Sequence, residues 1–451
     1  MQDLPILAID ISTNKIISVA AKFNKNNEIV ILSVGHCPSS GMKKGKITNM
    51  DLATLSIKKS IDKLKETYSG EFSKIYVNLP SVYAQLHNSK AMVNVPSGKI
   101  STKEIKTVLN TAINNASISS DYEVIHAIPN HFMIDGSFIQ DPQSYITNHL
   151  EAKVNIIAVS KNYLNNIRQA LRDYGLDSIA FVVNSYVTAQ AIADTALYDN
   201  SSSHGGLLVV DIGSSSTYAS ICKGKSCIFS KFYPIGGNNI SKDIALMLNT
   251  NFEDAENYKI EHGAISISEE EARQKVKLPK SNNNNSFTEV STEYLSTIIH
   301  CRLEELFYLI KDDIEQNNMF NAFKSGIVLT GGTSKIRGIK KLCFKIFENQ
   351  RVVKLDNGVL IENNYFNFAD PMYSTASSLV KYVLNPAPYY EIDSTKNLRA
   401  KKEVMEIVEK KQPIAKPLVA PKKSVASENE NVASNEKSFI KKILSLLDKH
   451  L

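Results

Sequence analysis

Two short apolar runs in the chain end in the same dipeptide, Asp-Ile, and are followed by small polar residues. The runs are Ile6–Ile11 and Leu208–Ile212, and a second β-rich run follows each of them, at Lys15–Ala20 and at Thr217–Cys222. This pattern predicts a buried strand, a tight turn and a returning strand. For either copy alone, chance is an equally good explanation. One copy in each half of the chain, however, indicates two similar α/β domains.

Between the two predicted hairpins, apolar residues recur with helical spacing over Thr102–Asn115 and Lys161–Tyr174. Ser101 and Ser160 precede these segments and are candidate N-caps. The rest of the stretch from residue 82 to residue 160 is rich in strand-like runs. We therefore expect a small α/β domain to be inserted here.

The composition changes near the C-terminus. Residues 391–436 have few apolar side chains to offset the entropy of ordering the backbone, so they are expected to be a disordered linker. In residues 437–451, apolar residues recur on one helical face and lysines flank that face. The pattern predicts an amphipathic helix on an anionic membrane surface, although such a helix can also dock on its own domain. The residues expected at the membrane are Phe439, Ile440, Lys441, Lys442, Ile443, Leu444, Leu446, Leu447 and Leu451.

Charge, hydropathy and cysteine content narrow the classes of function. The net charge is only +6, from 52 basic and 46 acidic side chains, and no dense basic block occurs before residue 385, so no nucleic acid partner is expected. Because the chain has no run of about 18 apolar residues and no signal-peptide pattern, we expect a soluble intracellular protein. The 5 cysteines are scattered and odd in number, and are expected to be reduced thiols, with Cys222 and Cys227 as ordinary strand residues.

Three segments have the residue types that hold a magnesium-bound phosphate, which needs close backbone N–H groups and carboxylates. Asp10 and Asp211 end the two predicted strands and are placed to hold a magnesium ion through its water shell. The third segment is Gly326–Ser334, where the adjacent glycines Gly331 and Gly332 allow close approach of the backbone to a ligand. The double glycine alone would be an ordinary loop, but three such segments in order favour a phosphate site. The turn residues that would supply amides and hydroxyls are Ser12, Thr13, Gly213, Ser214, Ser215 and Ser216.

These segments resemble those of the superfamily of actin, Hsp70 and the sugar kinases, which has two phosphate hairpins and an adenosine loop in this order. Further stretches resemble more closely the FtsA family of bacterial cell-division proteins, and this resemblance covers residues 4 to 384 and the tail. The stretches are Gly35–Gly45, Tyr233–Asn238, Ala255–Gly263 and Pro371–Ala376. The resemblance implies a two-lobed actin-like α/β fold that binds ATP and Mg²⁺, with an inserted small α/β subdomain.

Carried over by position, the resemblance assigns residues of both lobes to nucleotide binding. The first phosphate hairpin would consist of Asp10, Ser12, Thr13, Asn14 and Lys15, and the second of Asp211, Gly213, Ser214, Ser215 and Ser216. Glu256 and Lys259 would contact the ribose and the adenine, although taken alone they would be a solvated pair on a helix. The adenosine pocket would be lined by Gly331, Gly332 and Thr333, and Gly236 is included in the site.

Several positions depart from the family pattern. Ser12, Ser214 and Ser215 replace glycines, and Tyr218 stands where many relatives have an acidic residue. A tentative alignment puts Ala180 where actin has the glutamine near the attacking water, and a methyl group cannot orient or deprotonate water. We therefore predict no catalytic residue and expect weak or no ATPase activity, with the nucleotide acting mainly as a structural clamp.

The resemblance also sets the expected domain boundaries. Lobe 1 would comprise residues 1–81 and 161–203, with the inserted subdomain at 82–160. Lobe 2 would have its core at 204–240 and a small subdomain at 241–305. The closing elements of both lobes at 306–390, the linker at 391–436 and the amphipathic helix at 437–451 would follow.

By the same resemblance, the protein would form filaments and bind the C-terminal tail of the tubulin-like division protein FtsZ through residues 241–305. It would tether the division ring to the cytoplasmic face of the inner membrane during septum formation and help to recruit later division proteins. A pilus-assembly scaffold like PilM is one alternative, although it would not need the linker and the membrane helix. A sugar or acetate kinase is another, and would need a catalytic carboxylate facing an acceptor pocket.

Overall fold

The computed structural model describes residues 4–24, 28–177, 179–198, 205–223, 226–279, 287–348, 350, 352–354, 367–368, 370–384 and 390–400. The chain divides into two units, Met1–Lys402 and Glu403–Leu451, and every described residue belongs to the first. The predicted linker residues 401–436 and the predicted helix at 437–451 therefore lie outside the described residues. Within the described ranges, no helix combines the length and the apolar character needed to cross a membrane.

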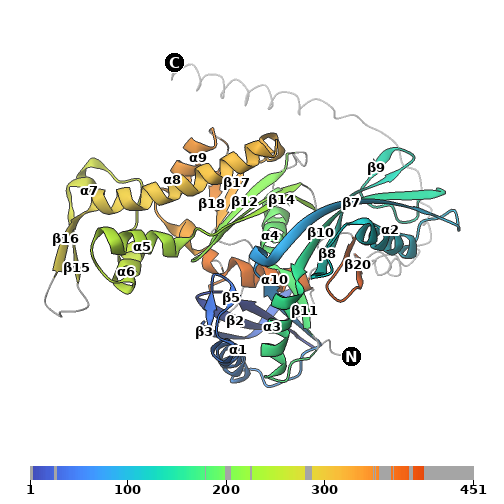
Figure 1. The fold of residues 1–451 in the computed structure, drawn as a ribbon, viewed down its shortest axis with the longest axis horizontal. Helices are drawn as coiled ribbons and strands as arrows, with labels where there is room; N and C mark the ends of the chain where they lie inside the picture. The colour runs from blue at the N-terminus through green and yellow to red at the C-terminus, as the bar shows by residue number, and fades with distance from the viewer. Residues whose placement is uncertain are drawn as a thin grey trace, which may run out of the picture. The chain divides into compact units, whose positions relative to one another are not determined.

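The first lobe is a five-stranded sheet with helices packed on it (Figure 1). Its elements are β1 (Ile6–Ile11), β2 (Lys15–Phe23), β3 (Ile29–Pro38), β4 (Met42–Lys43), β5 (Lys46–Ile47), α1 (Met50–Lys65), β6 (Lys74–Leu79), α3 (Lys161–Arg172), β11 (Ile179–Val183), α4 (Asn184–Tyr198), η4 (Pro371–Tyr373) and α10 (Ser374–Leu384). The strand order is β11-β6-β1-β2-β3. β1 and β2 are antiparallel, with Asp10 opposite Ile17, whereas β1, β6 and β11 are parallel. The predicted strand, turn and returning strand are therefore confirmed.

The second lobe repeats this arrangement. Its elements are β12 (Leu207–Ile212), β13 (Thr217–Lys223), β14 (Ser226–Tyr233), α5 (Gly237–Met247), α6 (Phe252–His262), α7 (Glu269–Arg273), β15 (Lys275–Pro279), β16 (Phe287–Ser291), α8 (Thr292–Gln316), η2 (Phe320–Ala322), β17 (Ile327–Thr330), η3 (Gly332–Lys335), α9 (Ile339–Ile346) and β18 (Val352–Lys354). The main sheet has the order β14-β13-β12-β17-β18. Asp211 lies opposite Tyr218, as Asp10 lies opposite Ile17 in the first lobe. The repeat in the sequence is therefore a repeat in the structure.

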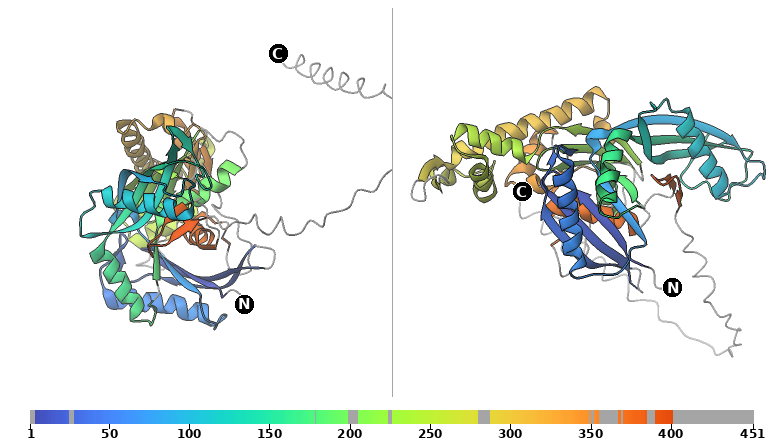
Figure 2. Two further views of the ribbon diagram at one scale, coloured as in Figure 1. Left: turned by 90° about the vertical axis from the view of Figure 1, so that its right-hand side faces the viewer. Right: turned by 60° about the horizontal axis from the view of Figure 1, so that its bottom comes forward.

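A third sheet forms the inserted domain, which extends from the first lobe (Figure 2). It is built from η1 (Ser81–Tyr83), β7 (Ala84–Asn94), α2 (Thr102–Asn115), β8 (Tyr122–Ile134), β9 (Ser137–Ile139) and β10 (His149–Ser160). The predicted helix at Thr102–Asn115 is confirmed, and Ser101 caps it together with Glu104 in a capping box. Ser160 occupies the N-cap position of α3, as predicted, but its side chain makes no capping hydrogen bond.

The prediction that the linker starts at residue 391 is wrong. Residues 390–400 form two strands, β19 (Tyr390–Ile392) and β20 (Leu398–Ala400), which extend the inserted sheet in the order β20-β19-β8-β10-β7. Ile392 pairs with Ala127 of β8, and the side chains of Tyr390 and Ile392 are buried in the core of the inserted domain. The composition of this stretch suggested disorder because its charged residues were assumed to be solvated, whereas Glu391 is fully buried.

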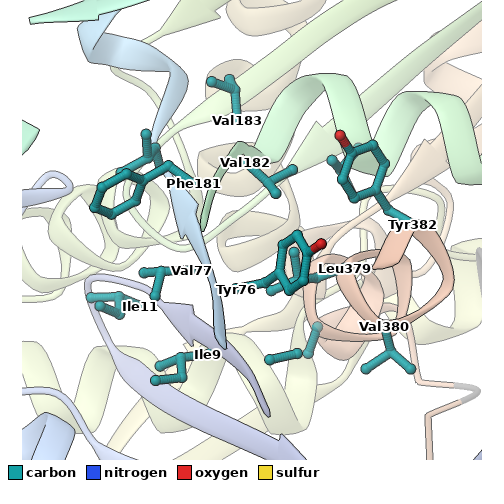
Figure 3. Packing of buried hydrophobic residues seen from close by; sticks show 14 of the residues in the cluster. Ile9, Ile11, Tyr76, Val77, Phe181, Val182, Val183, Leu379, Val380 and Tyr382 are labelled. Carbon is teal, nitrogen blue, oxygen red and sulfur yellow. The ribbon is translucent and has the colours of Figure 1, made fainter. Parts of the chain in front are cut away.

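The three sheets each carry their own hydrophobic core. In the first lobe, Ile9 and Val77 from the sheet pack in one cluster with Leu379 and Val380 of α10 (Figure 3). Burial of a side chain of this size contributes about 1.5–3 kcal/mol relative to exposure. The strands are therefore firmly held, and so are the turns at their ends where the candidate site residues lie.

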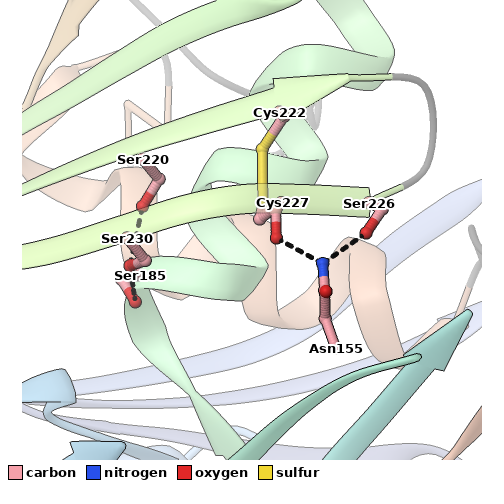
Figure 4. The surroundings of a disulfide bond; sticks show 7 residues. All are labelled: Asn155, Ser185, Ser220, Cys222, Ser226, Cys227 and Ser230. Carbon is pink, nitrogen blue, oxygen red and sulfur yellow. Dashed lines mark hydrogen bonds between the residues drawn. A yellow bond between two sulfur atoms is a disulfide. The ribbon is translucent and has the colours of Figure 1, made fainter. Parts of the chain in front are cut away.

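The expectation that all five cysteines are free thiols is wrong in this structure. Cys222 and Cys227 are joined by a disulfide (Figure 4). Both residues lie in strands, as predicted, and the pairing of β13 with β14 places them opposite each other, which brings their sulfur atoms together. Asn155 of β10 donates from Nδ2 to Ser226 Oγ (2.9 Å) and to the carbonyl of Cys227 (2.8 Å), so this hairpin is also attached to the inserted domain.

Candidate functional site

A cavity of about 480 Å³ lies between the turns of the two repeated hairpins. Its wall contains residues from both lobes and from the double-glycine segment. The predicted site residues that line it are Asp10, Ser12, Thr13, Asn14, Lys15, Asp211, Gly213, Ser214, Ser215, Ser216, Glu256, Lys259, Gly331, Gly332 and Thr333. The prediction that Asp10 and Asp211 face one cavity is therefore confirmed.

Both aspartates are buried at the ends of their strands. Asp10 is 2% exposed and accepts hydrogen bonds at Oδ1 from Ser12 Oγ (2.9 Å) and Asn78 Nδ2 (2.6 Å). Burial raises the pKa of Asp10 above its usual value, although Lys15 and these hydrogen bonds act in the opposite direction. Burial, with a further contribution from Asp10, raises the pKa of Asp211 to about 7, while Lys15 opposes this shift. Two desolvated carboxylates at one cavity are a donor set that suits a hard divalent cation such as Mg²⁺.

Lys15 supplies a positive charge to the same wall. Its ammonium lies 4.3 Å from the centre of the Tyr373 ring and donates to the carbonyl of Met372. Burial lowers the pKa of Lys15, although Asp10, Asp370 and Asp211 oppose this shift. A desolvated ammonium beside a cavity interacts strongly with an anionic group that enters it.

The two turns have the same backbone geometry despite the serines that replace family glycines. In the first turn, Ser12 N donates to Lys15 O (3.0 Å), and in the second, Gly213 N donates to Ser216 O (2.9 Å). Ser12, Ser214 and Ser215 are not among the non-glycine residues with positive φ. The serines therefore form the turns without backbone strain, and their N–H groups and hydroxyls remain suited to an anion.

Hydroxyl and ionic contacts join the two lobes around the cavity. Ser215 Oγ donates to Thr13 Oγ1 (3.0 Å), which directly connects the turns of the two hairpins. Lys335 Nζ lies 2.6 Å from Asp370 Oδ2, and this ion pair joins η3 of the second lobe to the residue that precedes η4. The cavity is therefore formed by both lobes together.

The double glycine has one special backbone position. Gly331 has φ +83° and ψ 159°, a conformation that is essentially confined to glycine, whereas Gly332 does not have positive φ. A Cβ on Gly331 would lie 2.4 Å from Asp211 Oδ1. Thr333 Oγ1 donates to the carbonyl of Gly213 (3.0 Å), so this loop is also tied to the second turn.

Gly236, which the resemblance assigns to the nucleotide site, is not among the residues that line the cavity. A Cβ at this position would lie 2.7 Å from the carbonyl oxygen of Gly213 and 2.7 Å from Ser216 N. Gly236 therefore packs closely against the backbone of the second turn. Its neighbour Gly237 forms part of the cavity wall.

Glu256 and Lys259 lie one turn apart on α6. Lys259 Nζ donates to Glu256 Oε2 (2.7 Å), Ser241 Oγ (2.9 Å) and the carbonyl of Gly237 (3.1 Å). Lys259 is 8% exposed, and burial lowers its pKa although Glu256 opposes the shift. The alternative of a solvated pair is therefore wrong, and the pair is a fixed polar corner of the cavity.

Sequence reasoning missed Asn184, which lines the cavity at the start of α4. Its Oδ1 accepts from Ser81 N (3.1 Å), Ser81 Oγ (2.9 Å) and Ser185 N (2.8 Å). Ala180, placed next to the attacking water by the tentative alignment, lies within β11 and is not part of the wall. The sequence did contain a signal for Asn184, because it is the polar residue that directly follows the apolar run of β11.

The remaining wall residues come mainly from segments that have no phosphate-type pattern. They are Ile11, Gly45, Pro80, Tyr218, Gly237, Ile260, Gly263, Lys335, Ile336, Met372, Ser374 and Thr375. Apolar and polar groups thus both line the cavity, as in many small-molecule sites.

The repeated sheets, with one aspartate from each at a shared cavity, define a protein with the actin-like ATPase fold. Solved structures agree. The chain is similar to a chain of the PilM–PilN type IV pilus biogenesis complex, with a TM-score of 0.59, 17% identity and coverage of 84% of this chain and 99% of that one. It is also similar to MreB 5 of Spiroplasma citri bound to AMPPNP, with a TM-score of 0.52, 12% identity and coverage of 86% and 97%.

Sequence relatives identify the family. The family model of cell division protein FtsA matches residues 208–378, and the model of the SHS2 domain inserted in FtsA matches residues 83–158. Cell division protein FtsA of Pseudomonas aeruginosa is 26% identical over 380 residues, covering 84% of this chain and 89% of the relative. That of Borreliella burgdorferi is 28% identical over 383 residues, covering 84% and 90%. The chain belongs to the FtsA family of bacterial cell-division proteins.

Proposed function

We propose that this protein binds Mg-ATP in the cavity between its lobes and tethers the FtsZ division ring to the cytoplasmic face of the inner membrane. The observation that carries the nucleotide proposal is the presence of Asp10, Asp211 and Lys15 in one cavity. The repeated hairpins supply one carboxylate each, and the solved MreB 5 with a similar fold was bound to AMPPNP. The tethering proposal is supported by membership of a cell-division family.

The residues of the wall have separate tasks in this proposal. Asp10 and Asp211 would hold Mg²⁺ through water, and when bound, the ion neutralises phosphate charge. The turn amides and Lys15 would hold the phosphates. Glu256 would accept from a ribose hydroxyl, and Lys259 would keep its carboxylate in place through their 2.7 Å contact.

Nucleotide affinity is expected to depend on Mg²⁺ and on Asp211. Fluorescence titration with a labelled ATP analogue should give affinity at least about tenfold higher with Mg²⁺ than without it, a difference of about 1.4 kcal/mol. Asp211→Asn should remove most of this difference. Asp243→Asn is the matched control, because Asp243 pairs with Arg302 and does not line the cavity. Equal Mg²⁺ dependence in wild type and Asp211→Asn would overturn the metal assignment.

Hydrolysis is proposed to be slow, with the nucleotide acting as a clamp between the lobes. Asn184 has an amide that can orient water, but an amide cannot accept the proton of the attacking water at neutral pH. The clamp role is supported by the contacts that join the lobes at Thr13–Ser215 and Lys335–Asp370. The test is a single-turnover measurement of ATP hydrolysis by the purified protein. Rapid conversion of all bound ATP to ADP would contradict this proposal.

The FtsZ tail is proposed to bind the small subdomain of the second lobe. Exposed apolar side chains lie there on α5 and α6, with Leu246 80% and Met247 53% exposed. Phe252, at the start of α6, is 43% exposed. An apolar surface of this kind favours docking of a peptide with apolar anchors.

Phe252→Glu is expected to weaken the capture of an FtsZ C-terminal tail peptide about tenfold or more, because a charge would replace an apolar contact. Phe344→Glu is the matched control, since Phe344 is also 43% exposed but lies on α9. The readout is a pull-down quantified over a peptide concentration series. Equal loss in both variants would mean that α5 and α6 do not form the specific site.

Filament formation and membrane attachment complete the proposal. Self-association would multiply weak membrane contacts of residues 437–451, which lie outside the described residues, through a high effective concentration. A PilM-like scaffold shares only the fold, at 17% identity, whereas the relatives at 26% and 28% are division proteins. We therefore do not propose the pilus role, nor the role of a small-molecule kinase.

A further inference from the structure

A buried ionic cluster attaches the C-terminal hairpin (β19 and β20, residues 390–400) to the rest of the protein. Glu391 of β19 and His126 of β8 are both fully buried, with 2.5 Å between Glu391 Oε1 and His126 Nδ1. Tyr382 of α10 donates from its hydroxyl to the same carboxylate oxygen (2.8 Å). A buried carboxylate is costly unless it is paired and hydrogen-bonded, so these contacts fix the position of β19.

The protonation of His126 follows from its second contact. The backbone N–H of Val183 donates to His126 Nε2 (2.9 Å), so Nε2 has no proton and the neutral ring carries its proton on Nδ1. His126 therefore donates to Glu391 and accepts from β11. Through one imidazole ring, the hairpin is connected to the end of a strand in the first lobe.

Arg399 of β20 supplies the balancing charge. Its guanidinium stacks 3.7 Å from the centre of the Tyr382 ring and donates to the carbonyl of Tyr382. Arg399 Nη1 lies 3.9 Å from Glu391 Oε2. Removal of the Glu391 charge would leave Arg399, of which the side chain is 11% exposed, with a weaker counter-charge, which is strongly unfavourable.

The backbone contributes little to this attachment. The register of β19 with β8 consists of Ile392 opposite Ala127, whereas β8 and β10 pair along most of their lengths. One further contact to the first lobe comes from Phe181 N, which donates to Ser394 Oγ in the loop of the hairpin (2.8 Å). Side chains therefore carry the attachment: Tyr390 and Ile392 are buried in the core of the inserted domain, Tyr390 donates to Asp141 Oδ1 (2.6 Å), and the ionic cluster adds its contacts to these.

The cluster contacts two residues, Val183 and Tyr382, whose neighbours along the chain include residues of the cavity wall. Val183 directly precedes Asn184, a wall residue, and both Val183 and Tyr382 belong to the core of the first lobe (Figure 3). Tyr382 lies two turns along α10 from Ser374 and Thr375, which are also wall residues. A rigid helix and a paired strand transmit small displacements over such distances.

We propose that the C-terminal hairpin is a latch that closes when nucleotide occupies the cavity and loosens when the cavity is empty. This inference rests on the proposed nucleotide binding. Nucleotide contacts at Asn184, Ser374 and Thr375 would hold β11 and α10 in the positions that His126 and Tyr382 need to bind Glu391. When the latch opens, residues 390–400 join the chain that leads to the C-terminal segment, and an extended stretch of this length adds up to about 36–40 Å of reach.

Hydrogen–deuterium exchange of the full-length protein tests the latch directly. We expect amides of residues 390–400 to exchange about tenfold more slowly, or slower still, with Mg-AMPPNP than without nucleotide, while amides of α2 are unchanged. Binding of AMPPNP is measured in parallel by titration. Absence of binding would overturn both the nucleotide proposal and the latch, whereas binding without any change at residues 390–400 would overturn the latch alone.

The variant Glu391→Gln provides an independent test because it keeps the size of the side chain and removes its charge. Residues 390–400 should then exchange rapidly with or without nucleotide, and nucleotide affinity should fall about fivefold or more, since coupling between two sites is reciprocal. Glu151→Gln, on β10 of the same sheet, is the control and should behave as wild type. Tyr382→Phe, which removes one hydroxyl, should give an intermediate exchange rate even if Glu391→Gln does not fold. Wild-type exchange at residues 390–400 in Tyr382→Phe would overturn the role of the cluster.

Discussion

The Gly331→Ala variant is expected to lose detectable nucleotide binding and to unfold at a temperature several degrees lower than wild type. The new Cβ would lie 2.4 Å from Asp211 Oδ1 and 2.5 Å from the carbonyl oxygen of Ile212. The backbone conformation of Gly331, φ +83° and ψ 159°, costs a residue with a Cβ about 1–3 kcal/mol by itself. Together, the clash and the strain should destabilise the second lobe by roughly 3 kcal/mol or more.

Loss of binding should follow because Asp211 must move to make room for the methyl group. Relief of the clash displaces the carboxylate that, in our proposal, faces the magnesium ion. Titration with a fluorescent nucleotide and scanning calorimetry measure the two effects separately. A variant that is destabilised but binds as well as wild type would show that the position of Asp211 does not matter for the ligand.

Gly332→Ala is the matched control for this prediction. Gly332 does not have positive φ, and the nearest atom to a Cβ there is Met372 Cβ at 3.6 Å, which is an ordinary contact distance. Because Gly332 itself lines the cavity, this control concerns stability alone, and we expect a thermal stability close to that of wild type. A large loss of stability in Gly332→Ala would mean that the whole loop is sensitive to substitution, and the specific argument about Gly331 would fail.

Phe439→Glu and Leu444→Glu are expected to release the protein from anionic liposomes into the supernatant. Each change removes an apolar side chain that would contribute about 1.5–3 kcal/mol to membrane burial and adds a like charge near anionic headgroups. A loss of this size lowers the affinity by about tenfold to a hundredfold or more. Co-sedimentation with liposomes of defined anionic content measures the bound fraction.

Ser445→Gln is the control for the membrane prediction, since residue 445 belongs to the polar face of the predicted helix. It should sediment with liposomes as wild type does. Because residues 437–451 lie far along the chain from the cavity wall, all three variants should keep wild-type nucleotide affinity. Retention of Phe439→Glu and Leu444→Glu on the liposomes would show that another surface binds the membrane.

Local patterns in the sequence predicted the elements that depend on local physics. The strand, turn and strand around Asp10 were predictable because a buried strand is continuously apolar and a turn needs small residues. The bounds of α2 were predictable because its apolar spacing starts directly after Ser101 and Glu104, which form a capping box. The convergence of Asp10 and Asp211 was expected from the resemblance to the actin superfamily, in which both phosphate hairpins belong to one nucleotide site.

Features that depend on contacts between distant residues were not predictable in this way. Glu391 looked like a linker residue, because its partner His126 is 265 residues away in the sequence. Lys259 looked solvated, because the groups that bury it, Gly237 and Ser241, belong to another helix. Asn184 was missed because it becomes a wall residue only through the packing of the start of α4 beside the hairpin turns of both lobes. In each case the tertiary partner, rather than the local pattern, decides the environment.

The inserted sheet combines strands from two distant parts of the chain, and this affects the order in which it can form during synthesis. β7, β8 and β10 leave the ribosome early, but β19 and β20 are translated after both lobes. Until then, the edge of β8 that pairs with β19 is open, and open edges invite pairing with other chains. A shortened version of the protein that is intended to remove only the tail should therefore end beyond residue 400, so that β19 and β20 are kept.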